Sequence, residues 1–527
     1  MCKIPSDIVN LPDAYQKEGL YSGGLECIKV EITLWGDELF RKLLVILTVI
    51  TFSWSVPASA AENDKALAGA STLGEVFGYI SQYHLKQPDV DQLTKASIKG
   101  MLDYLNDPYT VYFSPGELEQ FSDELNGDFE GIGAELEMQQ QYPYIVRVLK
   151  GSPAESAGLK NGDVIVAVDG KDLAGKPLYN VVTLLRGEKG SSVSITVRRA
   201  GQPERQVTIT RNTVNLPTVH GKYLGHGIGL IAIESFGMET GEEFANALGK
   251  LQEEGIQSLI IDLRNNGGGY VDSAAEIASY LLGKDKTVFV TEDWEKNKDS
   301  FVTELDPLIK EMQVVVLVNE QTASASEILA GALQDYGAAT LLGTHTYGKA
   351  TVQDIIPLQN GGALKLTTAF YTTPKGRLID GVGLQPDRYV STPGLQLYAA
   401  RQLLHPTKRV IQFTGEDPKV IINEETFYVP GGVLKEKGGH FIALRFTLEA
   451  LGYEVKWDSK SNDILVTGNG QAWLLPTDNK NRTVKGSSKQ LSQPLKKKNN
   501  TTYISVSDLV SMGIQVTVQD NKVIIDM

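Results

Sequence analysis

The sequence predicts a multidomain α/β protein. Between about residues 212 and 405, apolar runs of strand length alternate with segments of helical periodicity, which is typical of an α/β layer architecture. Residues 115–211 differ, because short predicted strands alternate there with Gly, Pro and Asp turns. The composition changes again after Pro406, and the total of 527 residues is long enough for about three domains.

The composition narrows the class of function. A hydrophobic content of 42% and a charged content of 22% are ordinary for a globular protein. The formal net charge of −14 argues against a nucleic-acid partner, which would need a basic surface. The six histidines show no H-E-x-x-H or other metal-ligand spacing. We therefore expect neither a metal nor another cofactor.

Residues 1–60 have the parts of an N-terminal extension and a secretory signal peptide. Arg41 and Lys42 precede the apolar run Leu43–Trp54, and Ala58-Ser59-Ala60 supplies an A-x-A cleavage site. Cleavage there would leave 527 − 60 = 467 residues outside the cytoplasm, in the cell envelope or secreted. Both cysteines lie in the removed part, so we expect no disulfide in the mature chain. The 40 residues ahead of Arg41 exceed what a signal needs, so we expect translation to begin within this stretch.

Residues 61–114 are expected to be mainly helical. Apolar residues from Leu73 to Ile80 fit one helical face, those from Leu93 to Leu105 fit another, and Pro108 is a helix breaker. Two or three helices are too few for an independent domain. We expect them to pack on the core or on a second subunit, which suggests a homodimer.

The module at 115–211 carries a specific series of turns. Gly131-Ile132-Gly133-Ala134 precedes a predicted strand, and Gly151-Ser152-Pro153-Ala154, Ala157-Gly158-Leu159 and Gly162-Asp163-Val164-Ile165 follow in order. This series resembles a PDZ domain of the bacterial protease-associated kind. Such domains add a peptide's extended C-terminal tail to a sheet edge and hold its carboxylate on backbone N–H groups. The resemblance places Gly131, Ile132, Gly133 and Ala134 in the carboxylate-binding loop.

Arg186 ends the predicted helix of this module, which runs from Tyr179 to Leu185. Two interpretations remain open for its side chain. One is a surface salt bridge, and the other is a regulatory contact that couples tail binding to the rest of the protein.

Ser324 lies at a junction of two periodicities. The continuous apolar run Val314–Val318 predicts a strand buried on both faces, and the segment after Ser326 has helical spacing with Gly337 as a stop. The positive end of a helix dipole would favour negative charge developing at this serine. However, Ser324 and Glu327 also form the S-x-x-E pattern of a capping box, so this segment alone leaves a helix cap and a nucleophile both open.

A second turn precedes the next helix. The predicted strand Ser258–Leu263 ends in Arg264-Asn265-Asn266-Gly267-Gly268-Gly269. Consecutive glycines at the end of a strand present bare backbone N–H groups, which are suited to an oxyanion hole. An ordinary tight turn is the alternative.

Four motifs in order carry a family resemblance. They are D-L-R-N-N-G-G-G, T-A-S-A-S-E-I-L-A-G-A-L, T-Y-G-K-A-T-V-Q and G-x-G-L-Q-P-D. Over about residues 70–405 the chain resembles the carboxyl-terminal processing peptidases, which are tail-specific serine proteases. The resemblance implies a ClpP/crotonase-like serine protease core at 212–405 with an inserted PDZ domain, and substrates that are proteins or peptides with free C-termini.

The family motifs assign roles to individual residues. They imply that Ser324 is the nucleophile, Lys349 its general base and Gln353 the residue that orients the lysine. The oxyanion hole would combine the N–H of Ala325 with that of Gly268 or Gly269. Two departures, Ala350 and Gly267, stand where the family commonly has glycine and proline, and neither is expected to touch a catalytic atom.

A lysine can act as a general base only if it loses its proton. A free lysine has a pKa of about 10.4, so a value of about 7 requires a shift of roughly 3 units. Burial can lower a lysine pKa by roughly 3 to 5 units, which makes the role feasible. Gln353 could accept a hydrogen bond from the amine without adding a charge that would raise this pKa.

Three other functions fit the sequence less well. A Ser/His/Asp triad would draw on residues near the predicted core, namely His220, His226, His345, Asp262, Asp335 and Asp354. No G-x-S-x-G elbow surrounds the serine, which disfavours the triad. A non-catalytic PDZ scaffold of the cell envelope is disfavoured by the intact Ser, Lys and Gln set, and a crotonase-like acyl-CoA enzyme by the predicted export.

Residues 420–527 form a further predicted α+β domain with an internal duplication. Two stretches, starting near Phe441 and Tyr503, each predict a strand, a helix and a hairpin. The first copy resembles the copper amine oxidase N-terminal-like domain. That name implies no copper here, because the domain has one histidine, His440. Attachment to the cell envelope or to a substrate is the expected role.

Overall fold

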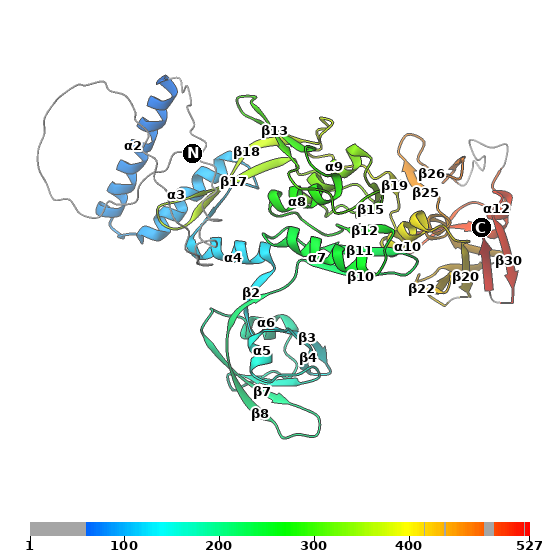
Figure 1. The fold of residues 1–527 in the computed structure, drawn as a ribbon, viewed down its shortest axis with the longest axis horizontal. Helices are drawn as coiled ribbons and strands as arrows, with labels where there is room; N and C mark the ends of the chain where they lie inside the picture. The colour runs from blue at the N-terminus through cyan, green and yellow to red at the C-terminus, as the bar shows by residue number, and fades with distance from the viewer. Residues whose placement is uncertain (1–59, 416, 437–438, 479–489, 521) are drawn as a thin grey trace, which may run out of the picture. The chain divides into compact units, whose positions relative to one another are not determined.

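The structure is a computed structural model that describes residues 60–415, 417–436, 439–478, 490–520 and 522–527 (Figure 1). The predicted signal peptide, except for Ala60, and both cysteines lie outside these residues. In the part that the structure describes, no helix is long and apolar enough to cross a membrane.

The chain divides into two compact units, Met1–Thr94 and Lys95–Met527. The first contains α2 (Ala60–Tyr83) and the start of α3 (Val90–Leu105), so the predicted helical character of this region is confirmed. Several large apolar side chains of α2 are exposed to solvent, among them Leu67, Leu73, Val76 and Tyr79.

The centre of the second unit is a six-stranded sheet in the order β10-β11-β12-β15-β16-β19. All its neighbouring strands are parallel except β10 and β11. Its strands are β10 (Val219–Tyr223), β11 (Ile228–Ile233), β12 (Ser258–Asp262), β15 (Gln313–Val318), β16 (Thr340–Gly343) and β19 (Arg388–Tyr389). The helices that pack on it are α7 (Thr240–Glu253), α8 (Val271–Leu282), α9 (Ala325–Tyr336) and α10 (Pro393–Leu404).

The predicted burial of the central strand on both faces is confirmed. Val314, Val316 and Val318 of β15 join the apolar core that includes α7, α8 and α9. Val315 and Leu317 point the other way, into the core formed with α10 and the C-terminal domain. Because successive side chains of a strand alternate between faces, a continuous apolar run is what two such cores require.

A second sheet carries part of the predicted site. Its order is β1-β18-β13-β14, with β17 paired to β18. The strands are β1 (Val111–Phe113), β13 (Thr287–Asp293), β14 (Lys298–Val302), β17 (Thr351–Pro357) and β18 (Ala363–Thr372). Strand β1 therefore ties the segment after α3 to the protease-like region, with Val111 opposite Lys365.

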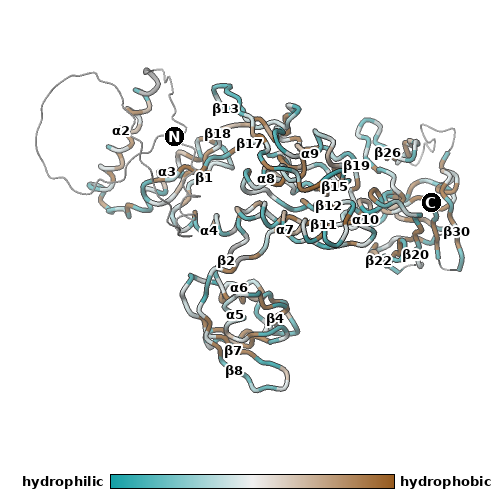
Figure 2. The backbone as a smooth tube through the Cα atoms, in the orientation of Figure 1, coloured by the Kyte–Doolittle hydropathy of each residue, from teal (hydrophilic) through white to brown (hydrophobic). Residues whose placement is uncertain are grey.

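The module predicted to resemble a PDZ domain has its own apolar core. Helix α4 (Pro115–Asn126) leads into it, and the two-stranded pair of β2 (Asp128–Gly131) and β9 (Asn212–Asn215) brackets it. Its sheet has the order β3-β4-β5-β7-β8, with β6 paired to β5. The elements are β3 (Ala134–Gln139), β4 (Tyr142–Val148), α5 (Pro153–Ser156), β5 (Val164–Val168), β6 (Lys171–Asp172), α6 (Leu178–Leu185), β7 (Ser192–Arg198) and β8 (Arg205–Thr210). In Figure 2 the hydrophobic colour is prominent along β7, whose residues Val193, Ile195 and Val197 are fully buried.

The C-terminal region shows the predicted duplication. The first copy is β24 (Gly439–Ala443), α11 (Leu444–Ala450), β25 (Glu454–Asp458) and β26 (Asp463–Gly468), and the second is β29 (Thr501–Ser505), α12 (Val506–Ser511), β30 (Gln515–Gln519) and β31 (Lys522–Asp526). The two copies meet where β24 pairs with β29. The remaining strands are β20 (Val410–Thr414), β21 (Lys419–Ile422), β22 (Glu425–Tyr428), β23 (Val433–Glu436), β27 (Gln471–Leu475) and β28 (Lys496–Lys498).

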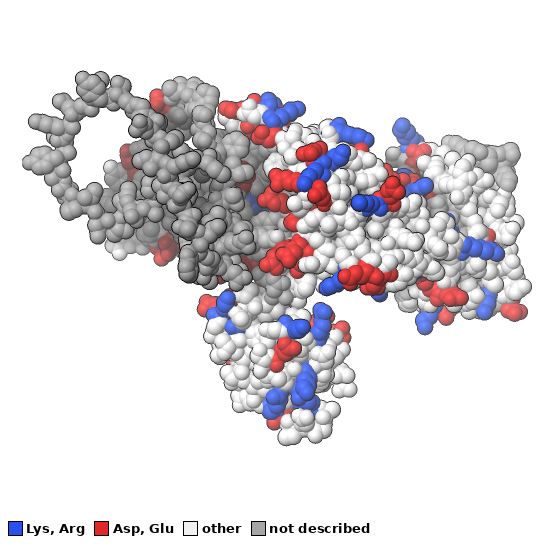
Figure 3. All heavy atoms as spheres, in the orientation of Figure 1, with Lys and Arg blue, Asp and Glu red and all other residues white. Residues whose placement is uncertain are grey.

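On the face seen in Figure 3, acidic and basic side chains are interspersed.

Candidate active site

Ser324 lies between the end of β15 and the start of α9, as the change of periodicity predicted. Its backbone has φ 57° and ψ −120°, a conformation that a non-glycine residue rarely adopts and that costs on the order of 1–3 kcal/mol. The turn before it is anchored by Thr322, whose fully buried hydroxyl donates to the carbonyl oxygen of Leu263 at 2.8 Å. The hydrogen-bonded turn before it therefore helps to hold Ser324 in a strained backbone conformation.

Glu327 holds Ser324 and Lys349 together through their backbones. One oxygen, Oε2, accepts hydrogen bonds from the N–H of Ser324 (3.0 Å) and of Lys349 (2.9 Å). The other, Oε1, accepts from the Thr346 hydroxyl and from the N–H of Gly348 (2.7 Å). The side chain is fully buried; burial raises the pKa of Glu327, while the same four donors lower it.

Of the capping box predicted from S-x-x-E, the glutamate half is present, because Glu327 Oε2 accepts from the Ser324 N–H, and this glutamate has a wider role through its bond to Lys349. The Glu327 N–H donates to the carbonyl oxygen of Ser324 at 2.8 Å, and the Ser324 side chain makes no cap hydrogen bond. The Ser324 hydroxyl is accordingly left for other chemistry.

Tyr371 makes the complementary link. Its hydroxyl, on the buried side chain at the end of β18, lies 2.9 Å from the carbonyl oxygen of Lys349 and 3.3 Å from that of Ser324. Burial holds the pKa of Tyr371 well above its usual range, so the group stays a neutral donor. Glu327 and Tyr371 together, which we call the backbone clamp, bind both the N–H and C=O groups of the predicted nucleophile and base.

The ammonium group of Lys349 is held elsewhere than on Ser324. Nζ lies 4.7 Å from the ring centroid of Tyr109, and no hydrogen bond joins it to the Ser324 hydroxyl in the described part of the chain. Burial lowers the pKa of Lys349, the nearby Lys365 lowers it further, and the carboxylates of Asp107 and Glu327 oppose this. The direction is the one that a general base requires.

Gln353 forms no hydrogen bond with Lys349 in the part of the chain that the structure describes. Its Nε2 donates to the hydroxyl of Thr351 (2.9 Å) and of Thr367 (3.3 Å). Residues two apart on a strand share a face, which puts Thr351 beside Gln353, and Thr367 is its partner on β18. The orienting role that the family motif implies for Gln353 therefore stays a prediction.

The glycine turn lies against Ser324. A Cβ added to Gly268, which has φ +104°, would come within 2.8 Å of the Ser324 Cβ and 3.0 Å of the Ala325 nitrogen. The Gly268 N–H already donates to Oδ1 of Asn266 at 2.8 Å. Ala325 and Gly269 have no backbone acceptor for their N–H groups among the described residues, so these two remain candidate oxyanion donors.

The residues of the alternative Ser/His/Asp triad are engaged elsewhere. His345 contacts the carbonyl oxygen of Thr346, and none of the three histidines forms a hydrogen bond with Ser324 within the described ranges. The other partners are Glu234 for His220, His405 for His226, Arg264 for Asp262, Arg377 for Asp335 and Thr368 for Asp354. The same ranges contain no group of three or more His, Cys, Asp or Glu side chains placed to hold a metal ion.

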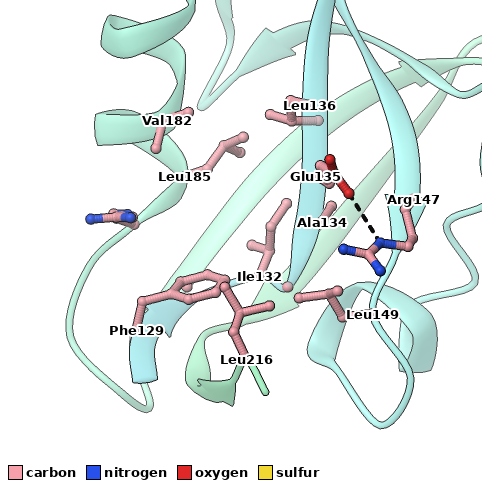
Figure 4. A pocket seen from close by; sticks show the side chains of 13 residues that line it. Phe129, Ile132, Ala134, Glu135, Leu136, Arg147, Leu149, Val182, Leu185 and Leu216 are labelled. Carbon is pink, nitrogen blue, oxygen red and sulfur yellow. Dashed lines mark hydrogen bonds and ion pairs between the residues drawn. The ribbon is translucent and has the colours of Figure 1, made fainter. Parts of the chain in front are cut away.

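A pocket of about 360 Å³ lies in the PDZ-like module, between β3 and α6 (Figure 4). Its lining is mainly apolar and includes Phe129, Ile132, Leu136, Val182, Leu185 and Leu216. The predicted carboxylate-binding loop, Gly131 to Ala134, forms one wall. The carbonyl oxygens of Ile132 and Gly133 accept from Ala154 and Leu149, whereas their N–H groups have no acceptor among the described residues.

Charged groups sit at the rim of this pocket. Glu135 and Arg147 form an exposed ion pair of 3.0 Å (Figure 4). Arg186 is exposed and forms no ion pair within the described ranges, and both interpretations of this residue stay predictions. Its guanidinium instead lies 5.5 Å from the ring centroid of Phe129, which lines the pocket.

Sequence reasoning missed part of this arrangement. It treated Glu327 only as a capping partner, and it gave no role to Tyr371 or Tyr109. One signal was available: Glu327 is a charged residue directly followed by the apolar segment I-L-A-G-A-L, and such a residue needs buried donors. No comparable signal marks the two tyrosines.

Comparisons with known proteins agree with the motifs. The chain matches the models of peptidase family S41 (227–390), the PDZ domain (144–199), the copper amine oxidase N-terminal domain (421–525) and the activating protease CtpB N-terminal domain (52–115). It is 38% identical over 372 residues to the carboxy-terminal processing protease CtpB of Bacillus subtilis (strain 168), covering 69% of this chain and 76% of that protein. It is 33% identical over 423 residues to a probable CtpA-like serine protease of Staphylococcus aureus (strain N315), covering 80% of each. The solved photosystem II D1 C-terminal processing protease aligns at 29% identity and a TM-score of 0.39, covering 64% of this chain and 92% of that one.

The family predicted from the motifs is therefore confirmed, as are the PDZ domain and the resemblance of the C-terminal domain. The chain belongs to the carboxy-terminal processing serine proteases of peptidase family S41.

Proposed function

We propose that the chain is an exported serine endopeptidase that binds protein C-terminal tails in its PDZ domain and cleaves peptide bonds with Ser324, Lys349 and Gln353. The observation that carries the proposal is the backbone clamp, because a single carboxylate and a single hydroxyl tie the nucleophile and the base to each other. A helix cap alone would not need Glu327 to bind Lys349, which is 22 residues away.

In the proposed reaction, neutral Lys349 accepts the proton of the Ser324 hydroxyl as its oxygen attacks the scissile carbonyl. The oxyanion that forms is stabilised by the N–H of Ala325 and by a glycine N–H of the turn, for which Gly269 is better placed than the already bonded Gly268. Lys349 returns the proton to the leaving amine, and an acyl-enzyme remains on Ser324. Water then attacks the ester with Lys349 again accepting a proton, which it passes to the leaving Ser324 oxygen, so that the new carboxyl end is released and the enzyme is restored.

The tail site supplies the selectivity. The free N–H groups of Ile132 and Gly133 would hold a terminal carboxylate, and the apolar pocket would take the side chain of the last residue. An extended tail would lie along β3, an edge strand of its sheet that faces α6. Substrates are therefore proteins or peptides with free C-termini and an apolar end.

Four further parts of the proposal concern the whole molecule. The signal-like residues 1–60 support export to the cell envelope or beyond. The parallel sheet flanked by helices supports a ClpP/crotonase-like core. The exposed apolar side chains of α2 support a homodimer. The C-terminal domain is proposed to attach the enzyme to the envelope or to a substrate.

The test compares one unfolded substrate with a free and with an amidated C-terminus. We expect faster cleavage of the free form, and we expect Ser324→Ala to abolish cleavage of both while tail-peptide binding persists. Equal rates for the two forms would contradict tail selection. Binding without turnover by the unaltered protein would favour a non-catalytic PDZ scaffold.

A further inference from the structure

The segment between α3 and β1 reaches the predicted general base. Tyr109, which is half-buried, presents its ring to the Lys349 ammonium, with Nζ 4.7 Å from the ring centroid. A cation within about 6 Å of a ring face is attracted by the ring's electrons. A residue of the N-terminal region thus touches an atom on which the proposed chemistry depends.

Tyr109 is held firmly in this place. Asp107 accepts hydrogen bonds from the Tyr109 N–H at 2.9 Å and from the Thr110 hydroxyl at 2.6 Å. The buried Thr110 hydroxyl accepts in turn from the N–H of Thr367 at 3.1 Å. Since Thr367 belongs to β18, which also pairs with β1, the ring is fixed to the same sheet that carries Gln353.

The contact that the structure shows between Tyr109 and Lys349 is made by the ring. Burial, and then the neighbouring Tyr347 hydroxyl, raise the pKa of Tyr109 to about 12. The phenol is therefore neutral at any working pH and offers no negative charge to pair with the lysine. What it offers is the ring face, which attracts an ammonium and does not attract a neutral amine.

Several charged groups surround Lys349 besides this ring. Those on the packed elements are Asp107 ahead of β1, Lys365 on β18, Glu327 on α9 and, next to Ala350, Asp380. Burial and Lys365 favour the neutral amine, whereas Asp107 and Glu327 favour the ammonium. The ring of Tyr109 adds to the second group.

We propose that Tyr109 is a positioning residue for the general base, whose ring holds the Lys349 ammonium in a resting position where it is not bonded to Ser324. To accept the Ser324 proton, Lys349 must first lose its own proton and leave the ring. The ring opposes both steps, because it attracts the ammonium and not the neutral amine. This inference rests on the proposed role of Lys349 as the base.

The experiment measures kcat/KM against pH on a tail-bearing peptide. Tyr109→Leu removes the ring but keeps an apolar side chain, so the acid limb of the profile should move to lower pH by about one unit, with about tenfold higher kcat/KM below the limb. Tyr109→Phe keeps the ring and should leave the acid limb in place. Tyr109→Trp has a stronger ring face and should move the limb to higher pH, so it carries the test if Tyr109→Leu does not fold.

A matched control lies three residues further along the chain. Tyr112 is on β1, and its hydroxyl accepts from Nδ2 of Asn360 at 2.8 Å rather than contacting Lys349. Tyr112→Leu should leave the acid limb unchanged. An equal shift in Tyr112→Leu and Tyr109→Leu would overturn the inference, since it would indicate a general loosening of β1.

A second measurement separates this inference from the proposed mechanism. Acetylation of Lys349 by acetic anhydride, quantified by mass spectrometry across pH, reports its pKa without any catalysis. A lower pKa of Lys349, as measured by labelling, in Tyr109→Leu supports the inference. If the acid limb of the kcat/KM profile does not move with this pKa, then Lys349 is not the base and the proposed function is wrong. An unchanged labelling pKa in Tyr109→Leu and Tyr109→Trp would overturn the inference.

Discussion

The backbone clamp differs in composition and in expected role from the apolar pocket of the PDZ domain between β3 and α6, which we call the tail pocket. The clamp is polar and fully buried, and four donors converge on the one carboxylate of Glu327. The tail pocket is an apolar cavity of about 360 Å³ with an ion pair at its rim, and the N–H groups of Ile132 and Gly133 have no acceptor among the described residues. The clamp fixes two residues of the chain, whereas the tail pocket has space for a bound peptide.

The difference between the clamp and the tail pocket indicates which parts of each can change conformation. Around Ser324 and Lys349 the clamp fixes the main chain, while the side chains of Lys349 and Gln353 contact other residues. The proposed reaction would therefore need only a change of side-chain conformation to begin. In the proposed tail site, by contrast, we expect the shape of the Gly131 to Ala134 loop to decide binding. Substitutions in the clamp should therefore lower catalysis, whereas substitutions in the tail pocket should lower tail-peptide affinity. Three predictions test this difference.

The largest effect is expected at the clamp. Glu327→Gln places an NH2 group where N–H donors converge, which leaves buried donors unpaired at about 1–3 kcal/mol each and shifts Ser324 relative to Lys349. A misplacement on the order of 1 Å can cost about a hundredfold in rate, so we expect kcat/KM to fall by about 10² or more. Steady-state hydrolysis and thermal unfolding measure the two effects.

Asp335 provides the matched control for this prediction. It lies on the same helix, α9, and its buried carboxylate accepts from the N–H of Lys375 (2.8 Å) and pairs with Arg377 (2.6 Å), away from Ser324. Asp335→Asn should lower the unfolding temperature but spare kcat. If Glu327→Gln behaved in the same way, the clamp would be only a structural bond, and the contrast with the tail pocket would disappear.

A smaller effect is expected at the tail pocket. Gly133 has φ +76°, and an added Cβ would lie 2.3 Å from the Cβ of Ser152, so Gly133→Ala must displace the loop. We expect tail-peptide affinity to fall about tenfold, or about 1.4 kcal/mol, measured by fluorescence anisotropy on the Ser324→Ala background. Cleavage of an amidated peptide should change little, because the clamp is untouched.

Gly151 separates collision from backbone strain. Its φ of +77° is nearly the same, but an added Cβ would meet open space. Gly151→Ala should therefore cost some stability through strain alone and leave tail affinity within about twofold. Similar losses of affinity in both variants would show that the shape of the loop around Ile132 does not determine binding.

The limits of sequence reasoning follow the same division. The strand, turn and helix around Ser324 are local, and periodicity predicted them correctly, including the stop at Gly337. The clamp is not local, because Tyr371 comes from another sheet and reaches the carbonyl groups only after folding. Gln353 is a further case: the family motif implies that it orients Lys349, and the structure adds two partners that the motif does not indicate, since its amide donates to Thr351 and to Thr367, which lies opposite it on β18.

The smallest effect is expected at Arg186, whose guanidinium lies over Phe129 at the edge of the tail pocket. An exposed cation–π contact is worth about 0.5–1 kcal/mol, so Arg186→Glu should weaken tail-peptide binding by about two- to fivefold. If the residue also couples tail binding to proteolysis, the ratio of cleavage rates for free and amidated substrates should fall with it. Arg198 is the matched control, since it lies at the same 5.5 Å from the ring of Tyr142 but outside the pocket, and it also pairs with Glu204. An equal loss of tail-peptide affinity in Arg198→Glu would indicate a general effect of charge on an acidic protein. If the ratio of cleavage rates for free and amidated substrates does not change in Arg186→Glu, then Arg186 does not couple the tail pocket to the clamp.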